Sequence, residues 1–375
     1  MKIALVHDYL VQNGGAEKVL ECFIELFPNA PIYTLVYNKE FMHGKFADKK
    51  IRTSFIQKIP FAKKYHRVFP QFMPMAIEQF DFSNYDIVLS DSSSYAKGVI
   101  TGPDTLHICY MHTPMRYAWD DCQKYTSDFD FPSFIKKLVP FAMNYIRIWD
   151  RVSADRPDKI IANSNFVSKR IKKYYKRDSV VIHPPVNVGN FYASEKSEDP
   201  SLRAEASYFL MVGRLLAYKR HDIAIEAFNK LGLRLKIIGR GPELKRLKKI
   251  AGANIEFLER VTDAELPKYY AECKAFIFPQ EEDFGIVAME ALASGKPVIA
   301  FRGGDIEEHI EEGKTGIFFE RQNVEDIIAA MGRFDQLSHD SEYVRAQAQK
   351  FDKSLFKAKI KEYVEVECAK FKAIK

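Results

Sequence analysis

Short apolar runs alternate with amphipathic stretches along most of the chain. The runs that predict strands are residues 2–7, 31–36, 86–90, 106–111, 159–163, 208–212, 233–238, 254–258, 275–279 and 297–301. Most are continuously apolar, as is typical of parallel strands that are buried on both faces. Between them, apolar residues recur at helical spacing, for example in residues 16–27, 165–176 and 220–231. This alternation predicts parallel sheets with right-handed crossovers.

The alternation stops once and then restarts, which indicates two domains. Residues 183–187 contain Pro184 and Pro185, which can neither continue a helix nor lie in a central strand, so a linker is expected there. We predict an α/β fold of two Rossmann-like, doubly wound parallel-sheet domains, one of residues 1–187 and one of residues 188–354. Ligands bind beyond the carboxyl ends of such strands, so two facing domains would share an interdomain cleft.

The composition is that of a globular protein, with 47% hydrophobic and 28% charged residues. No apolar run is long enough to span a bilayer, and the first residues predict a strand and not a signal peptide, so residence in the cytoplasm is the expectation. The five cysteines form no C-x-x-C pair, which favours reduced thiols over a disulfide framework or a zinc site.

Charge is unevenly distributed along the chain, whose net charge is +6. Residues 1–187 contain 26 Lys and Arg against 19 Asp and Glu, and residues 355–375 contain 6 against 3. Residues 188–354 have a net negative charge, with 24 Lys and Arg against 28 Asp and Glu. If the C-terminal helix packs on the first domain, that domain is strongly basic. It then suits an anionic partner such as phospholipid or a lipid-linked diphosphate, although a merely solvated basic surface also explains it. No nucleic-acid-binding module is present, so no such partner is expected.

The first motif is Gly14-Gly15, which follows the first predicted strand. Two glycines there let the backbone turn tightly and approach a phosphate at a helix N-terminus. The spacing is not G-x-G-x-x-G, and a plain tight turn between strand and helix explains the pair as well.

Two cations follow the first strand of the second domain. Gly213 and Arg214 leave the strand, and Lys219 precedes the next helix. At the carboxyl edge of a sheet, an Arg fork and a Lys point charge can together hold a diphosphate. The alternative is a solvated basic surface.

The most informative segment, residues 281–295, contains Glu282 before a predicted helix and Glu290 inside it. Carboxylates accept hydrogen bonds from sugar hydroxyls, so this pair suits a sugar and a ribose. Gly285 at the helix start leaves backbone N–H groups available for a ligand. An acidic helix N-terminus explains residues 281–283 equally well but does not explain Glu290.

His112 follows a strand of the first domain and begins a run of polar and aromatic residues, 112–120, so it is expected at the cleft. A rival signal is the D-x-D pair Asp128 and Asp130, which could hold a divalent metal for a diphosphate donor. The pair does not follow a strand, and Arg214 and Lys219 already offer charge neutralisation, so no metal is expected.

These segments together resemble the retaining glycosyltransferases of family 4 (glycosyl transferases group 1), which have the two-domain GT-B fold. The resemblance covers nearly the whole chain. It is carried by the Glu-x7-Glu pair, Phe284-Gly285, residues 295–298, Gly213-Arg214 with Lys219, residues 239–242 and residues 257–263. Residues 112–117 resemble a subgroup of bacterial O-antigen and exopolysaccharide mannosyltransferases.

The resemblance implies a role for each motif. The expected catalytic residues are His112, Glu282, Arg214 and Lys219. The expected donor-binding residues are Gly14, Gly15, Arg214, Lys219, Gly239, Arg260, Val261, Glu282, Phe284, Gly285, Ile286, Val287 and Glu290. Within this set, Arg214 and Lys219 would bind the diphosphate, Glu290 the ribose, and the loop at Arg260-Val261 would border the base. The C-terminal helix, residues 355–375, would cross back onto the first domain.

The implied reaction transfers a hexose with retention of anomeric configuration and needs neither a metal nor another cofactor. The resemblance of residues 112–117 favours mannose from GDP-mannose, passed to a hydroxyl of a glycan or lipid-linked acceptor in cell-surface polysaccharide assembly, including lipopolysaccharide. Three alternatives remain open: a UDP-sugar-dependent transferase of the same family, a nucleotide-sugar epimerase or phosphorylase, and a non-catalytic nucleotide-sugar-binding protein.

Residues 55–80 interleave aromatic residues with Lys58, Lys63, Lys64, His66 and Arg67. That pattern is typical of a segment that lies on an anionic membrane, which would make the protein peripheral at the inner face of the cytoplasmic membrane. An amphipathic helix packed on the core explains the pattern as well.

Overall fold

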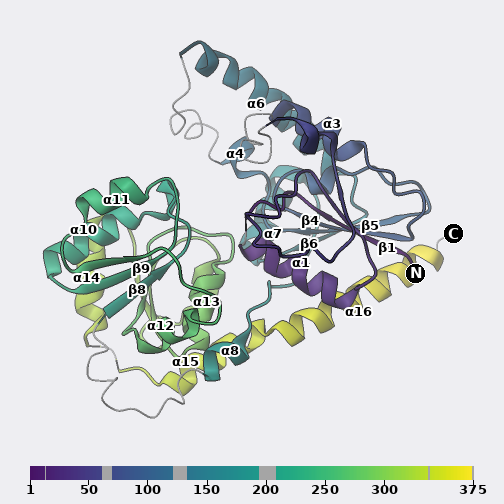
Figure 1. The fold of residues 1–375 in the computed structure, drawn as a ribbon. Coiled ribbons are helices and arrows are strands. Elements are labelled where there is room, and N and C mark those ends of the chain that lie inside the picture. Colours follow the sequence, from purple (N-terminus) through teal and green to yellow (C-terminus); the bar gives the residue numbers. More distant parts are fainter. Residues whose placement is uncertain (13, 61–69, 121–132, 194–207, 337, 374–375) are drawn as a thin grey trace. The chain divides into compact units, whose positions relative to one another are not determined.

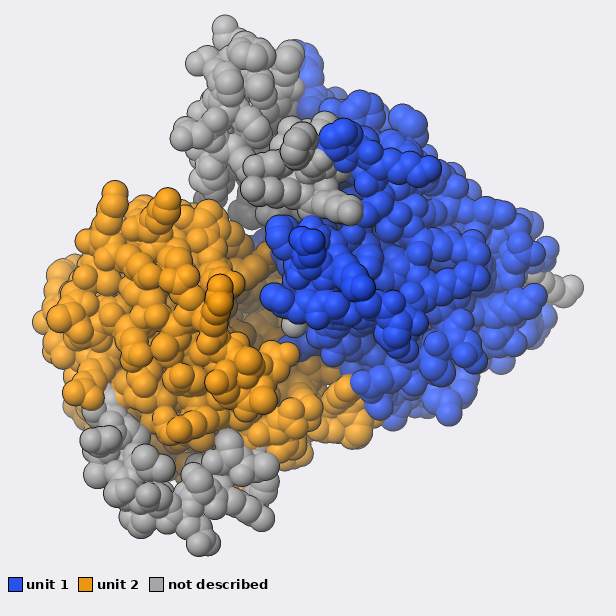
Figure 2. Space-filling view, in the orientation of Figure 1, with its two compact units in different colours: residues 1–184, 356–375 blue, residues 185–355 orange. Residues whose placement is uncertain are grey.

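The computed structural model describes residues 1–12, 14–60, 70–120, 133–193, 208–336 and 338–373, shown as a ribbon in Figure 1. The chain divides into two compact units, which Figure 2 colours separately. Unit 1 comprises Met1–Pro184 and Phe356–Lys375, and unit 2 comprises Pro185–Leu355. The sequence placed the corresponding boundaries at 187/188 and 354/355.

Unit 1 is built on a seven-stranded parallel sheet with the strand order β3-β2-β1-β4-β5-β6-β7. The strands are β1 Ile3–His7, β2 Ile32–Thr34, β3 Ile51–Thr53, β4 Ile87–Ser92, β5 Leu106–Met111, β6 Lys159–Ala162 and β7 Val180–Val181. β1 lies between β2 and β4, with Leu5 opposite both Ile32 and Leu89. The carboxyl ends of β1, β4 and β5 are therefore neighbours.

Helices cover both faces of this sheet. They are α1 Gly15–Leu26, η1 Phe55–Lys58, η3 Pro70–Phe72, α3 Met73–Glu78, η4 Ala96–Gly98, α4 Arg116–Trp119, α6 Ser133–Ser153, α7 Asn165–Tyr175 and most of α16 Lys353–Ala373. α1 and α16 meet on one face, where the rings of Phe23 and Phe356 stack with their centroids 6.2 Å apart. α3 and α6 lie over the opposite face and bury Met73, Ile77 and Ile146.

Unit 2 is built on a six-stranded parallel sheet with the order β10-β9-β8-β11-β12-β13. Its strands are β8 Tyr208–Val212, β9 Arg234–Ile238, β10 Ile255–Leu258, β11 Phe276–Phe278, β12 Val298–Phe301 and β13 Gly316–Phe319. Its helices are α8 Val188–Ala193, η6 Ala217–Lys219, α10 His221–Leu231, α11 Leu244–Ile250, α12 Leu266–Glu272, α13 Ile286–Ala293, η7 Asp305–Glu308, α14 Val324–Phe334, α15 Ser341–Ala348 and η8 Gln349–Phe351. Two separate apolar clusters fill this unit.

The predicted fold class, two doubly wound parallel sheets, is confirmed. Each run that predicted a strand contains one, and three strands were missed: β3, β7 and β13. Two of these are only two and three residues long, too short for a periodic signal. Among the described residues, none of the helices combines the length and apolarity that crossing a membrane requires.

Candidate functional site

The predicted diphosphate-binding cations lie just beyond the carboxyl end of β8. The Lys219 Nζ is 2.6 Å from Glu282 Oε1, and the two side chains are 11% and 17% exposed. Burial alone would lower the pKa of Lys219, but the charge of Glu282 and its hydrogen bond outweigh burial, so this pKa lies above its ordinary value. Lys219 is therefore a charged ammonium. The nearby positive charge of exposed Arg214 acts in the opposite direction on this pKa, so two cations repel each other here.

Two glycines explain how the backbone places Arg214. The Gly213 N–H donates to Ile238 O at 3.0 Å, and the Leu215 N–H donates to Arg240 O at 2.8 Å, which joins the loops after β8 and β9. A Cβ at Gly239, whose φ is +151°, would lie 1.9 Å from Gly213 O. Gly239 was predicted to touch the donor, and the structure gives it a packing role: only glycine lets these backbones approach.

Glu282 is held by a residue that the sequence analysis missed. It forms a β-bridge with Gly304, and the Asp305 N–H donates to Glu282 O at 3.1 Å. A Cβ at Gly304, with φ +83°, would lie 2.4 Å from that same oxygen. The signal available was Gly303-Gly304, which follows the predicted strand at 297–301 after a single residue, Arg302.

The next predicted donor-binding residues begin α13. Gly285 is its N-cap in the left-handed conformation, with φ +79°. The Phe284 side chain is buried between His309 and Phe351, so only its backbone is available to a ligand. The N–H groups of the first turn, which includes Ile286 and Val287, have no partner within an α-helix and suit an oxygen-rich ligand.

Glu290, the second carboxylate of the predicted pair, lies inside α13 and is almost completely buried. Its residue is only 1% exposed, and the Tyr270 hydroxyl lies 3.1 Å from Glu290 Oε2. Burial and then the charge of Glu290 raise the pKa of Tyr270 well above its ordinary value. The ribose contact of Glu290 stays a prediction. Arg260 is exposed and Val261 half-buried in the loop that follows β10.

In unit 1, four side chains form a connected chain at the carboxyl ends of the central strands. His112 Nε2 bonds Asp91 Oδ1, and His7 Nδ1 lies 2.8 Å from Asp91 Oδ2. His7 Nε2 is 3.6 Å from Glu17 Oε1, and Glu17 Oε2 accepts the Gly14 N–H at 2.7 Å. The chain thus links His112 to the glycine pair, and Gly15 begins α1.

Charge is balanced along this chain. Burial would raise the pKa of Asp91, but His112 and His7 hold it below its ordinary value. Burial would lower the pKa of His7, but Asp91 and Glu17 raise it to about 10. A charged Asp91 accepts the Nε2–H of His112, which orients the ring. The sequence analysis missed Asp91, although it directly follows the predicted strand 86–90, because its register opposite His7 depends on the strand order.

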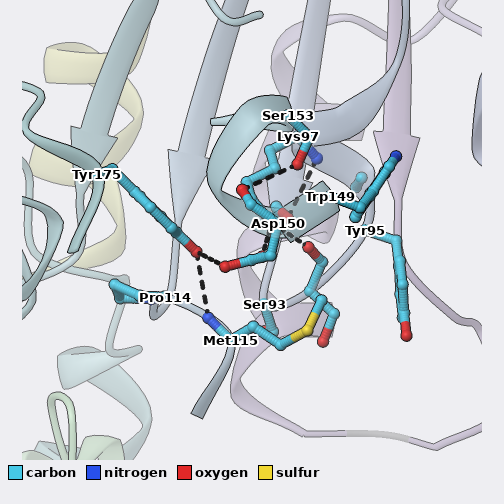
Figure 3. Close-up of polar contacts among 12 residues, drawn as sticks. Ser93, Tyr95, Lys97, Pro114, Met115, Trp149, Asp150, Ser153 and Tyr175 are labelled. Carbon is cyan, nitrogen blue, oxygen red and sulfur yellow. Dashed lines mark hydrogen bonds and ion pairs between the residues drawn. The ribbon is translucent and has the colours of Figure 1, made fainter. Parts of the chain in front are cut away.

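The segment after His112 is anchored at several points. The Met115 N–H donates to the Tyr175 hydroxyl at 3.3 Å, and that hydroxyl donates to Asp150 Oδ2 at 2.8 Å (Figure 3). Asp150 also accepts Lys97 Nζ at 2.5 Å and Trp119 Nε1 at 2.7 Å. The contacts of Met115 and Trp119 therefore fix the position of the polar and aromatic run 112–120 in unit 1.

Asp128 and Asp130, the rival metal-binding pair, lie outside the described residues, as do Lys63, Lys64, His66 and Arg67.

Known proteins match both halves of the chain. Residues 13–190 match the model of Glycosyltransferase Family 4, and residues 193–351 match that of the glycosyl transferases group 1. The chain belongs to glycosyltransferase family 4. Its curated relatives include an uncharacterized glycosyltransferase of Methanocaldococcus jannaschii, 28% identical over 48% of this chain and 50% of that protein. Another is a GDP-mannose-dependent α-(1-6)-phosphatidylinositol monomannoside mannosyltransferase of Mycolicibacterium smegmatis. It is 27% identical over 52% of this chain and 56% of that protein.

The sulfoquinovosyl transferase of Arabidopsis thaliana is 33% identical over 40% of this chain and 31% of that protein. The chain thus spans about a third to just over half of the length of these relatives. Among solved structures, Anabaena HepE in complex with UDP aligns with TM-score 0.72 and 17% identity over 98% of this chain and 100% of that one. Sucrose-phosphate synthase of Thermosynechococcus elongatus aligns with TM-score 0.70 and 15% identity over the same shares. These likenesses identify the GT-B fold.

Proposed function

We propose that this protein is a glycosyltransferase that moves a hexose from a nucleotide sugar to a hydroxyl of a glycan or lipid-linked acceptor, with retention of configuration. The observation that carries the proposal is the grouping of Arg214, Lys219 and Glu282 at the carboxyl edge of the unit 2 sheet. Lys219 is ion-paired with Glu282 and feels the positive charge of Arg214, so an arriving diphosphate would meet two cations at this edge.

Donor binding would exchange one partner of Lys219 for another. The diphosphate takes the ammonium and the Arg214 guanidinium, and Glu282 is released to accept hydrogen bonds from sugar hydroxyls. The backbone N–H groups that begin α13 would donate hydrogen bonds to oxygen atoms of the same donor. Lys219 and Arg214 then stabilise the charge that develops on the leaving diphosphate, which is the main contribution of the protein to rate.

The proposed transfer needs no enzyme nucleophile. The bond between the anomeric carbon and the diphosphate oxygen breaks, and the acceptor oxygen bonds to that carbon on the same face. The acceptor proton passes to the departing diphosphate oxygen. We propose that His112, oriented by Asp91, contacts the transferring sugar.

Mannose from GDP-mannose is the proposed donor, supported by the likeness of residues 112–117 to mannosyltransferases and by the mycobacterial relative. A UDP-sugar donor is the second candidate, because the solved HepE structures hold UDP and UDP-glucose. The proposed setting is cell-surface polysaccharide assembly in the cytoplasm, with peripheral contact to the inner membrane face and no metal requirement.

Thermal unfolding with GDP-mannose, UDP-glucose, UDP-GlcNAc, UDP-galactose and NAD, each with and without EDTA, tests the proposal. A ligand that binds only the folded state raises the unfolding temperature by mass action. We expect GDP-mannose to raise it with or without EDTA, and Lys219→Ala to abolish the effect. No shift with any nucleotide sugar, or a shift with NAD alone, contradicts the proposal. Conversion of the donor without an acceptor would favour an epimerase or phosphorylase, and binding without turnover a non-catalytic protein.

A further inference from the structure

Exposed apolar side chains gather on α6 of unit 1. Phe141, Tyr145, Ile148 and Val152 are 76%, 50%, 58% and 56% exposed. Their spacing of four, three and four residues places all four within about 60° of one another around a helix. They form one continuous apolar stripe that runs along the helix for three turns.

The stripe is not needed by the core of unit 1. The opposite side of α6 already packs on the core through Met143, Ile146 and Trp149, which are 6%, 0% and 9% exposed. α6 is thus apolar on two faces, and only one of them is covered by the unit. Apolar patches exposed in this way mark surfaces that contact another apolar phase or molecule.

Elements that neighbour α6 also expose apolar side chains. η3 packs against α6, and the Trp149 Nε1–H donates to Glu78 Oε1 of α3 at 2.8 Å, so these elements lie side by side (Figure 1). Phe72 and Met75 on them are 40% and 58% exposed. We call Phe72, Met75, Phe141, Tyr145, Ile148 and Val152 the α6 patch.

Charge identifies what would cover the α6 patch. The sequence of α6 contains four basic residues, Lys136, Lys137, Arg147 and Arg151, and one acid, Asp150, which is buried and ion-paired with Lys97. Unit 1 as a whole has 32 Lys and Arg against 22 Asp and Glu, whereas unit 2 is acidic. An apolar helix face on a unit with this net positive charge is complementary to a bilayer that has anionic headgroups.

We propose that the α6 patch is a membrane-docking surface that inserts into the interface of an anionic bilayer. This deepens the proposed function, because a lipid-linked acceptor would be met at that surface, and it extends the contact expected of segment 55–80, to which Phe72 and Met75 belong, to α6. The stripe supplies the apolar burial, and the net positive charge of unit 1 supplies attraction that salt screens.

Vesicle flotation of the full chain tests the inference, with vesicles of phosphatidylcholine alone or mixed with phosphatidylglycerol. We expect binding to the anionic vesicles at low salt, and a loss of about tenfold or more in Phe141→Ser/Val152→Ser. The matched control is Phe41→Ser/Val366→Ser, which removes one Phe and one Val that are 48% and 43% exposed elsewhere in unit 1. Equal binding by both double variants would overturn the inference.

Three further measurements distinguish docking from self-association and from failure of the donor assignment. Tyr145→Trp keeps an aromatic ring in the patch, and its fluorescence should shift to the blue on anionic vesicles; no shift contradicts docking. Sedimentation of the wild type detects self-association, and a dimer that the patch variant disrupts, without vesicle binding, would overturn docking in favour of a second copy. Stabilisation by GDP-mannose should be unchanged in the patch variant, so failure of the donor assignment is recognised separately.

Discussion

The Lys219 ammonium and the Glu282 carboxylate lie 2.6 Å apart, as an ion pair between the loop after β8 and the loop after β11. Both side chains are largely but not wholly shielded from water, so the pair is stronger than one at the surface and still open to exchange. A donor diphosphate offers Lys219 two negative charges in place of one. The ion pair therefore keeps the ammonium in place until the donor arrives.

Removing either cation of this edge should slow transfer strongly. We expect Lys219→Ala or Arg214→Ala to lower kcat by about 10²- to 10³-fold, because the charge on the leaving diphosphate loses its partner. Steady-state kinetics with the donor identified by thermal unfolding would measure this. Lys230→Ala, which removes a 58% exposed lysine of α10, is the matched control and should leave kcat unchanged. Wild-type kcat in the first two variants would refute the diphosphate role.

His112 should matter more for turnover than for donor binding. We expect His112→Ala to lower kcat by about 10²-fold with little change in the donor dissociation constant, since the ring is proposed to contact the transferring sugar. Asp91→Asn should reproduce part of the loss, because the amide can donate a proton where the ring nitrogen needs an acceptor. Comparison of single-turnover rates with donor affinity separates the two effects. Unchanged turnover in His112→Ala would count against the assignment.

Stability should fall as pH rises above neutrality, because of His7. Its pKa is raised from 6.5 to about 10 in the folded chain, so the folded state holds a proton that the unfolded state loses above pH 6.5. This stabilisation is complete below pH 6.5 and is lost as pH rises toward 10, by at most about 1.4 kcal/mol per pH unit. Urea unfolding between pH 6 and 10 measures it, and the slope should be smaller in His7→Gln. Equal slopes would show that His7 is neutral in the folded protein.

Replacement of Gly239 should destabilise the fold, because its backbone packs closely against that of Gly213. Ala at this position would put a Cβ 1.9 Å from Gly213 O at a φ of +151°, so the two loops must separate. We expect Gly239→Ala to cost about 3 kcal/mol or more and to weaken donor binding, since Arg214 moves with the loop. Gly232→Ala is the control: it has φ +67° but open space around the added Cβ, and should cost only about 1 kcal/mol. Similar unfolding free energies for both variants would exclude the steric argument.

How far the sequence could predict the site depends on whether contacts are local. The place of Arg214 and Lys219 beyond a strand end follows from the alternation of elements alone. The bond between Asp91 and His112 depends on β4 and β5 being neighbours, which no local pattern specifies. The burial of Glu290 depends likewise on Tyr270 of α12, twenty residues earlier in the chain. Strand β13 was missed because residues 316–319 are few and begin with glycine.

The aromatic and polar run 112–120 shows a second limit. Its composition indicated function, yet Trp119 bonds directly, and Met115 bonds through Tyr175, to Asp150, a buried carboxylate more than thirty residues later on α6. Polar and aromatic residues serve equally in a segment that is anchored to the rest of its domain and in a segment that binds a ligand. Only the structure separates His112, which is bonded to Asp91, from Trp119, which is an anchor.

Asp150 should be the most sensitive of these anchors. It is fully buried and joins Lys97, Trp119 and Tyr175, so Asp150→Asn leaves the ammonium of Lys97 in a buried site without a compensating charge. We expect a loss of about 3–5 kcal/mol in the free energy of unfolding. Lys97→Met/Asp150→Asn removes both charges and should recover part of this loss. Chemical denaturation of the three proteins measures the difference. If Asp150→Asn and the double variant are equally stable, the Lys97–Asp150 charge pair does not hold this region together, and the neutral bonds from Trp119 and Tyr175 suffice.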